Sequence, residues 1–250
     1  MKTAYSSSAL SPPPSSLRIL LWDIDGTLVR SARVGLFKEY TIPVLEEVFG
    51  TAGRLHELSV SGMTDLQIVF EALRDEGFTD EQIRAKVRDL RERYMRAMEH
   101  ATAGGQSLFE LLPGAREALA ATAADPRYRN ALLTGNIEPA ARLKMQLVNL
   151  SHFFELPGAF GDDSHDRREL PALAARRINK HLELALQPSQ FIVIGDTPND
   201  IACARHFGAR ALAVATGRSY SPDQLSACEP DAVVPDLSDT ERFLTILDQL

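Results

Sequence analysis

Short apolar runs recur along the chain, and each ends at a polar residue, a glycine or a proline. The first run, LRILLW, occupies residues 17–22 and stops at Asp23. Further runs lie at residues 131–133, 159–160, 191–194, 211–215 and 232–234. Continuous apolar runs, rather than alternating ones, are typical of strands buried on both faces of a parallel sheet. The pattern therefore predicts a parallel sheet of short strands.

Helical patterns separate most of these runs. Helix-forming composition or apolar residues at helical spacing mark residues 114–124, 139–148, 170–186 and 198–206, and Gly208 is placed to end the last of these helices. Strands that alternate with helices indicate an α/β fold with a doubly wound parallel sheet.

One long stretch breaks the alternation, because helical patterns dominate from about residue 36 to residue 111. Candidate helices lie there at residues 37–49, 65–76 and 80–102. We therefore predict a helical domain at residues 35–111, inserted into a core domain made of residues 17–34 and 112–250. Residues 1–16 are rich in Ser and Pro and predict a disordered tail.

The bulk composition excludes some classes of function. A net charge of −7 argues against a nucleic-acid-binding protein, which usually presents a broad basic face. The two cysteines, Cys203 and Cys228, are too few for a disulfide framework, so a reducing compartment and a cytoplasmic location are expected. No apolar run approaches the roughly 20 residues that span a bilayer, so no membrane partner is expected. The sequence does not specify an oligomeric state.

Acidic residues follow two of the predicted strands. Asp23 and Asp25 come directly after the first strand, and Gly26 allows a sharp bend behind them. In a doubly wound sheet, ligands bind at the carboxyl ends of the strands. One carboxylate there can attack phosphorus while the other moves a proton. A polar turn is the alternative for an isolated DxDG, but the apolar strand that runs directly into DxDGT favours catalysis.

A second acidic motif, GDTPND, follows the run at residues 191–194. Asp196 occupies the same place after its strand as Asp23 does after its own, whereas Asp200 also suits the cap of the next helix. Clustered carboxylates repel one another unless a cation lies between them, and Mg²⁺ prefers carboxylate, phosphate and water oxygens. A third polar strand end, Thr134-Gly135-Asn136, can donate hydrogen bonds to phosphate oxygens.

The motifs WDIDGTL, LLTGN and VIGDTPND, in this order, resemble those of the haloacid dehalogenase superfamily of phosphohydrolases. The resemblance covers essentially all of the chain after the Ser- and Pro-rich tail. The helical stretch resembles the cap domain of the subgroup that contains phosphoglycolate phosphatase and β-phosphoglucomutase. The resemblance implies a Rossmann-like core with an inserted helical cap.

The resemblance also implies roles for single residues. Asp23 would attack phosphorus to form an aspartyl-phosphate, and Asp25 would protonate the leaving oxygen. Mg²⁺ would be held by Asp23, the main-chain carbonyl of Asp25, and Asp196. Asp200 would support the water molecules of the metal or the side chain of Arg167. Phosphoryl oxygens would be bound by Thr134, Gly135, Asn136 and a cation. The family usually has a lysine as this cation, often followed by proline; this chain lacks that pair, so Arg167 is preferred and Arg168 is the alternative.

Within the predicted cap, the segment SGMTD matches a substrate-facing segment of relatives. Gly62, Thr64 and Asp65 are therefore candidate substrate contacts, although Thr64 or Asp65 equally suits a helix N-cap. A closing cap favours a small phosphorylated metabolite, for which phosphoglycolate is the first trial. A phosphomutase would keep every motif found here. A catalytically silent binding module is less favoured, because it would be expected to lack one of the acids.

Overall fold

A five-stranded parallel sheet forms the centre of the molecule. The computed structural model describes residues 16–103 and 107–250, so the predicted tail, apart from Ser16, lies outside the described residues. The strands lie in the order β4 (Tyr128–Leu132), β1 (Arg18–Trp22), β5 (Phe191–Gly195), β6 (Arg210–Val214) and β7 (Ala232–Val234). Every neighbouring pair is parallel. The predicted α/β class with a doubly wound sheet is confirmed.

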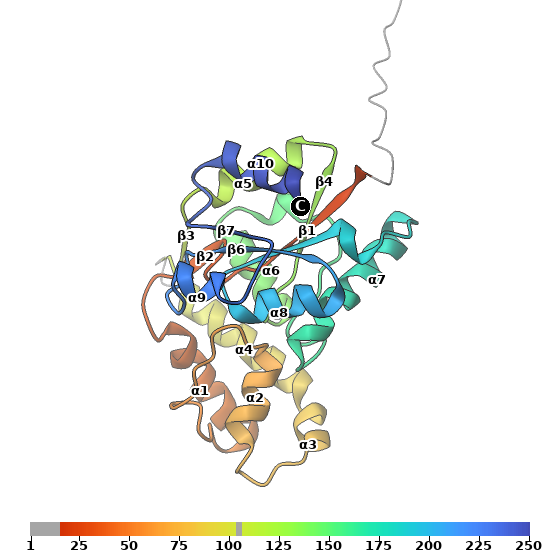
Figure 1. Cartoon of the computed structure of the whole chain (residues 1–250). Helices are drawn as coiled ribbons and strands as arrows, with labels where there is room; N and C mark the ends of the chain where they lie inside the picture. The colour runs from red at the N-terminus through yellow and green to blue at the C-terminus, as the bar shows by residue number, and fades with distance from the viewer. Residues whose placement is uncertain (1–15, 104–106) are drawn as a thin grey trace, which may run out of the picture.

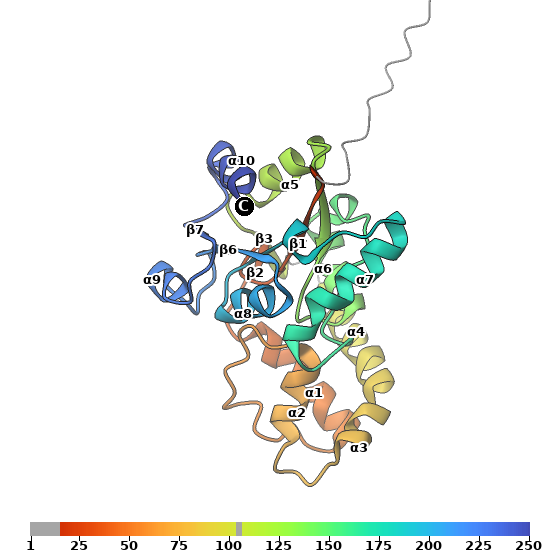
Figure 2. The same ribbon diagram turned by 45° about the vertical axis from the view of Figure 1, so that its right-hand side comes forward.

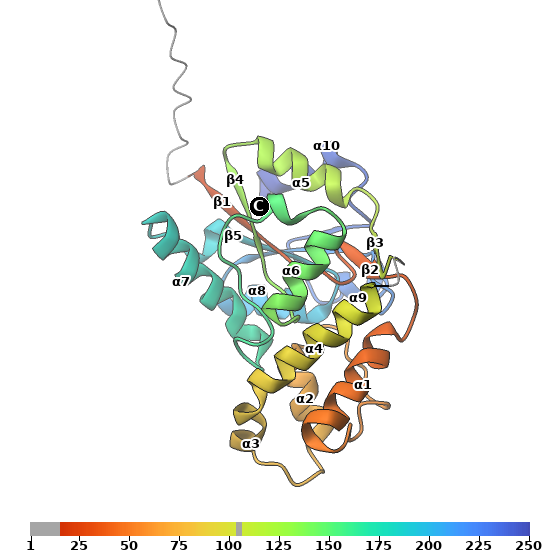
Figure 3. The same ribbon diagram turned by 180° about the vertical axis from the view of Figure 1, so that it is seen from behind.

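Helices cover both faces of this sheet. One face packs against α5 (Ala115–Ala124), α6 (Glu138–Leu147) and α10 (Thr240–Gln249). The other face packs against α7 (Leu170–Leu182), α8 (Pro198–Phe207) and α9 (Pro222–Ser226). The views from the front and from behind show these two layers (Figures 1 and 3). Consecutive residues of β1 alternate between the layers, since Leu20 and Trp22 join the first while Ile19 and Leu21 join the second.

The helical insertion forms a separate group of helices beside the sheet (Figures 1 and 2). It contains α1 (Leu36–Phe49), α2 (Asp65–Leu73), α3 (Asp80–Ala85) and α4 (Val87–Thr102). A two-stranded antiparallel sheet, β2 (Val29–Ser31) with β3 (Phe109–Leu111), brings the chain into this group and out of it. The predicted limits of the cap domain, residues 35 and 111, stay a prediction.

Two local predictions differ from the structure. The single helix predicted at residues 80–102 is interrupted at Lys86, which is neither Gly nor Pro. Its ammonium donates to the carbonyl of Val48 and lies 5.3 Å from the ring centroid of Phe49, so a contact with α1 accompanies the break. The strand predicted at residues 159–160 is only an isolated bridge between Ala159 and Leu133, because glycines flank so short a run.

No helix in the described ranges is both long enough and apolar enough to cross a membrane.

Candidate active site

Two adjacent strands bring the first and last acidic motifs together. β1 and β5 are paired as far as Trp22 and Ile194, and the amide of Asp23 donates to the carbonyl of Ile194 at 2.9 Å. Asp23 and Asp196 thus leave neighbouring strands at the same edge, and both are buried. Carboxylate oxygens of Asp23, Asp196 and Asp200 lie within 4.8 Å of one another. The structure therefore brings together three acids that are far apart in the sequence.

Gly26 allows the chain to pass directly beside Asp196. Its φ of +91° is unfavourable for other residues, and a Cβ added there would stand 2.2 Å from Asp196 Oδ2. Gly217 approaches the same carboxylate, where a Cβ would stand 1.8 Å from Oδ2. The hydroxyl of Thr27 donates to Asp196 Oδ1 at 3.4 Å. Backbone and hydroxyl groups therefore enclose the Asp196 carboxylate and fix its direction.

Asp200 has two functions in the structure. Its Oδ2 accepts from the amide and the hydroxyl of Thr197, at 3.0 and 2.7 Å, within the capping box that starts α8. Its Oδ1 accepts from Arg167 Nη2 at 2.5 Å. These are the contacts of a helix cap and of an ion pair with Arg167; the predicted support of a metal site by Asp200 stays a prediction.

Of the two arginines predicted as the cation, Arg167 reaches the acidic cluster and Arg168 does not; the binding of phosphate by Arg167 stays a prediction. A 3₁₀ turn, η3 (Arg167–Glu169), buries the Arg167 side chain, and its Nη2 donates to Asp23 Oδ1 at 2.9 Å. Arg167 Nε is buried and has no hydrogen-bond partner among the described residues. Arg168 is exposed and pairs with Asp166. Arg167 thus neutralises part of the acidic cluster.

Burial dominates the electrostatics of the cluster. It raises the pKa of Asp23 to about 7, against the opposing charge of Arg167 and with a further increase from Asp200. Burial also raises the pKa of Asp196 well above its ordinary value, and repulsion from Asp23 adds to this rise. One guanidinium does not balance three acids that lie so close together. Their enclosed carboxylate oxygens suit a hard divalent cation such as Mg²⁺.

The Thr134-Gly135-Asn136 segment follows β4, on the other side of β1. The side-chain amide of Asn136 donates to Asp25 Oδ2 at 2.7 Å and to the Thr134 hydroxyl at 2.9 Å. Thr134 is fully buried, and Gly135 lines a cavity next to Asp23. The predicted binding of phosphate by these three residues stays a prediction, and the Asn136 side chain is directed to Asp25.

The sequence analysis did not find Lys144, which lies on α6. Its ammonium contacts Asp25 Oδ2 at 2.6 Å and Asn136 Oδ1 at 2.5 Å, and the residue is buried. Burial alone would lower the pKa of Lys144, but the charges of Asp25, Tyr40 and Asp65 and the hydrogen bond to Asp25 together outweigh this effect, and the pKa is raised. Ala140 and Ala141 lie four and three residues before it on the buried side of the same helix. A lysine within an apolar helical stripe was therefore the available signal.

The predicted cap residues lie where the insertion meets the core. The carbonyl of Gly62 accepts from the Asn199 side-chain amide at 2.8 Å, and the Thr64 hydroxyl caps α2 by accepting from Gln67 N. The amide of Asp65 donates to the carbonyl of Gly135 at 2.6 Å, and its Oδ2 accepts from Ile137 N at 2.8 Å. Burial raises the pKa of Asp65 to about 7. These contacts join the insertion to the carboxyl ends of β4 and β5.

A cavity of about 190 Å³ lies between these parts. The core contributes Asp23, Asp25 and Arg167 to its lining, and the insertion contributes apolar side chains. The apolar residues are Phe37, Tyr40, Val60, Met63 and Ile68. Asp23, Asp25, Lys144 and Arg167 thus line the cavity from the core, and the insertion adds mainly apolar groups together with Asp65.

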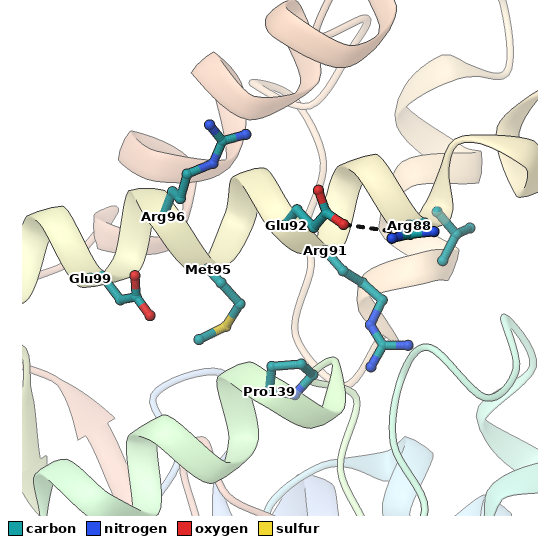
Figure 4. A pocket seen from close by; sticks show the side chains of 8 residues that line it. Arg88, Arg91, Glu92, Met95, Arg96, Glu99 and Pro139 are labelled. Atoms are coloured by element: carbon teal, nitrogen blue, oxygen red, sulfur yellow. Dashed lines mark hydrogen bonds and ion pairs between the residues drawn. The ribbon is translucent and has the colours of Figure 1, made fainter.

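A larger cavity of about 730 Å³ lies between α4 and α6. Figure 4 shows Met95 and Pro139 on its two sides, with Arg88 paired to Glu92 along α4. None of the sequence-predicted site residues lines it. We therefore assign the candidate active site to the smaller cavity.

Comparisons with known proteins agree with this geometry. Residues 169–240 match a family model described as HAD-hydrolase-like. A phosphoglycolate phosphatase of Pectobacterium atrosepticum is 27% identical over 233 residues, which are 93% of this chain and 92% of that protein.

Solved structures share the fold along almost the whole chain. A predicted phosphoglycolate phosphatase of Haemophilus somnus superimposes with a TM-score of 0.62 at 19% identity, covering 92% of this chain and 98% of its own. A β-phosphoglucomutase of Clostridium difficile gives a TM-score of 0.64 at 14% identity, covering 93% of this chain and 98% of its own. The motifs, the fold and these comparisons together show that the chain is similar to haloacid dehalogenase-like hydrolases, and in particular to the subgroup of phosphoglycolate phosphatase and β-phosphoglucomutase.

Proposed function

We propose that this protein is a Mg²⁺-dependent phosphatase that hydrolyses a small phosphate monoester through an aspartyl-phosphate on Asp23. The observation that carries the proposal is the buried cluster of Asp23, Asp196 and Asp200, with Arg167 beside it, at the carboxyl end of a parallel sheet. Phosphoryl transfer depends mainly on positioning and on neutralisation of charge. Arg167 fixes the position of the Asp23 carboxylate, which meets the requirement for positioning.

The side chains divide the work between them. Asp23 attacks phosphorus, and its contact with Arg167 Nη2 at 2.9 Å fixes the attacking carboxylate. Arg167 also binds phosphoryl oxygens, since its side chain lines the cavity beside Asp23. Asp25 gives a proton to the leaving oxygen and later takes one from the water that releases phosphate. Thr134 and Gly135 complete the phosphate site.

Asp23, Asp196 and the main-chain carbonyl of Asp25 would hold Mg²⁺, with Asp200 supporting Arg167. The ion would offset the repulsion between the nucleophilic carboxylate and an anionic ester. The enclosure of Asp196 by Gly26 and Gly217 supports this assignment, because it directs the carboxylate toward Asp23 and Asp200.

The cavity supports a small substrate. About 190 Å³ accommodates a compact metabolite and not a folded phosphoprotein. The relative from Pectobacterium atrosepticum is named a phosphoglycolate phosphatase, so phosphoglycolate is the first compound to test. A cytoplasmic location and the absence of nucleic-acid and membrane partners stay predictions.

The test is a screen of phosphorylated metabolites with Mg²⁺, in which phosphate release is measured for the wild type and for Asp23→Asn. We expect the wild type to release phosphate from at least one small ester and the variant to lose nearly all of this activity while keeping its melting temperature. Wild-type-like turnover by Asp23→Asn would exclude Asp23 as the nucleophile. Isomerisation of a sugar phosphate without net phosphate release would instead indicate a phosphomutase.

A further inference from the structure

Asp25 is held at only one of its two carboxylate oxygens. Oδ2 accepts from Lys144 Nζ at 2.6 Å and from Asn136 Nδ2 at 2.7 Å. Oδ1 has no hydrogen bond to any described residue, although the side chain lines the cavity and is 40% exposed. The two oxygens of this carboxylate therefore have different surroundings.

Lys144, Asn136 and Asp25 form a closed triangle. Asn136 donates to Asp25 and accepts from Lys144 at 2.5 Å, and the Thr134 hydroxyl anchors the same amide at 2.9 Å. Lys144 reaches the triangle from α6, and its ammonium lies 5.1 Å from the ring centroid of Phe109. Each member is fixed by at least two contacts, so the triangle has little freedom to rotate.

The placement of Lys144 is costly for the fold. A buried ammonium is unfavourable unless it is paired and hydrogen-bonded, and an apolar residue would stabilise a helix interface equally well. Here the partner of the buried ammonium is a carboxylate that faces the cavity, and the ammonium itself lines that cavity. This arrangement suits a role at the site better than a role in packing alone.

We infer that Lys144, through Asn136 and its own contact with Asp25 Oδ2, is a positioning residue that keeps Asp25 Oδ1 directed at the leaving-group oxygen. The inference rests on the proposed function. Two donors on Oδ2 leave that oxygen no room for a proton, so the transferable proton belongs on Oδ1. When Asp23 bonds to phosphorus and the ester P–O bond breaks, this proton passes from Oδ1 to the departing oxygen. When water attacks the aspartyl-phosphate, its proton returns to the same Oδ1.

Dependence on the leaving group tests this inference. An alkyl phosphate needs a proton on its departing oxygen, whereas the p-nitrophenolate of p-nitrophenyl phosphate departs without one. We expect Lys144→Met to lower kcat/KM about 10- to 100-fold for the best alkyl ester found in the screen and by less than about threefold for p-nitrophenyl phosphate. The ratio kcat/KM reports the steps up to departure of the leaving group and excludes the later attack of water, in which the two esters share one intermediate.

Two further variants complete the design. Lys144→Gln keeps a hydrogen-bond donor and should restore part of the alkyl-ester rate; it also replaces Lys144→Met in the comparison if that protein does not fold. Arg142→Met removes an exposed cation from the same helix and should leave both rates unchanged.

Equal losses of kcat/KM on the two esters, or no loss on either, would overturn the role of Lys144 and leave the proposed function intact. If the wild type hydrolysed neither ester nor any other compound in the screen, the proposed function would fail and this inference with it.

Discussion

Among single residues, the acids in and around the site differ in the groups that balance their charge. Asp23 and Asp200 share Arg167, and Asp25 is paired with Lys144. Asp65 has the backbone amide of Ile137 as its closest hydrogen-bond partner and no ion pair within the described ranges. A buried carboxylate without an adjacent counter-charge should make its own contribution to the pH dependence of stability.

Asp65→Asn should remove this contribution. The pKa of Asp65 is raised from 3.8 to about 7, mainly by burial, so the folded state binds a proton that the unfolded state releases. Its stabilising effect is complete below about pH 4 and is lost as the pH rises through 7. The free energy of unfolding, measured with urea, should therefore fall between pH 5 and pH 8 by about 2–3 kcal/mol more for the wild type than for Asp65→Asn.

Asp89→Asn removes an exposed acid from α4 and is the matched control for a lost negative charge. If the wild type and Asp65→Asn gave parallel pH profiles, the folded protein would not retain a proton on Asp65.

Some site residues could be predicted from the sequence and others could not. Asp23, Asp25 and Asp196 follow apolar strands directly, so the strand pattern alone places them at the sheet edge. For the cation, the sequence favoured Arg167 but left Arg168 as an alternative, because the choice depends on which side chain the turn at η3 buries. Lys144 was missed because a lysine on an amphipathic helix is usually solvated, and only the packing of α6 shows that it faces inward.

At the scale of secondary structure elements, the loop before α2 connects the insertion to the site, in addition to the residues of α1 and α2 that line the cavity. The loop before α2 contacts the start of α8 through Gly62. Gly62 has a φ of +74°, and a Cβ added to it would stand 2.8 Å from both Asn199 Nδ2 and Thr197 Oγ1 of the α8 start. The carbonyl of Gly62 also accepts from Arg167 Nη1 at 3.4 Å. A side chain on residue 62 would therefore push the loop away from Thr197 and Asn199.

Gly62→Ala is expected to lower kcat/KM by tenfold or more, because the loop can no longer close against α8. The matched control is Gly77→Ala, which has nearly the same φ, +79°, and nothing within 4 Å of its added Cβ. Both changes should lower the unfolding free energy by about 1 kcal/mol through backbone strain. Steady-state kinetics should then separate them, and equal activity of the two variants would contradict the importance of this contact.

Elements were predicted better where the pattern is local. The helices α5, α6, α7 and α8 were expected close to their observed limits, and Gly208 ends α8 as predicted, whereas α9 and α10 were not predicted. The interruption at Lys86 could not be predicted, because it accompanies a contact with α1 that lies 38 residues away in the sequence. The pairing of β2 with β3 was missed for a similar reason, since each strand has only three residues and its partner is distant.

At the scale of the whole molecule, the acidic cluster lies where strands from opposite ends of the chain meet. Residues 23 and 196 are brought together only when β1 and β5 pair, so folding of the core creates the cluster and its internal repulsion. A ligand that binds only this folded arrangement should stabilise the whole protein by mass action.

Mg²⁺ should therefore raise the melting temperature, and EDTA should reverse the rise. At about 100 times the dissociation constant, the gain is about 2.7 kcal/mol. Asp196→Asn should lose most of this gain, yet without Mg²⁺ it should melt above the wild type, because one buried negative charge is removed. Calorimetry with KCl of equal ionic strength is the control. A melting temperature insensitive to Mg²⁺ in the wild type would argue against a cation held by these acids.

The central claim is that Asp23 becomes phosphorylated during turnover, and a covalent trap tests it most directly. The wild type would be mixed with the best ester and Mg²⁺, quenched in acid within one turnover, digested and analysed by mass spectrometry. The account predicts a phosphoryl group on Asp23 that is absent when Asp23→Asn or EDTA-treated protein is used. A phosphorylated peptide that does not contain Asp23, or turnover without any trapped phosphoprotein, would contradict it.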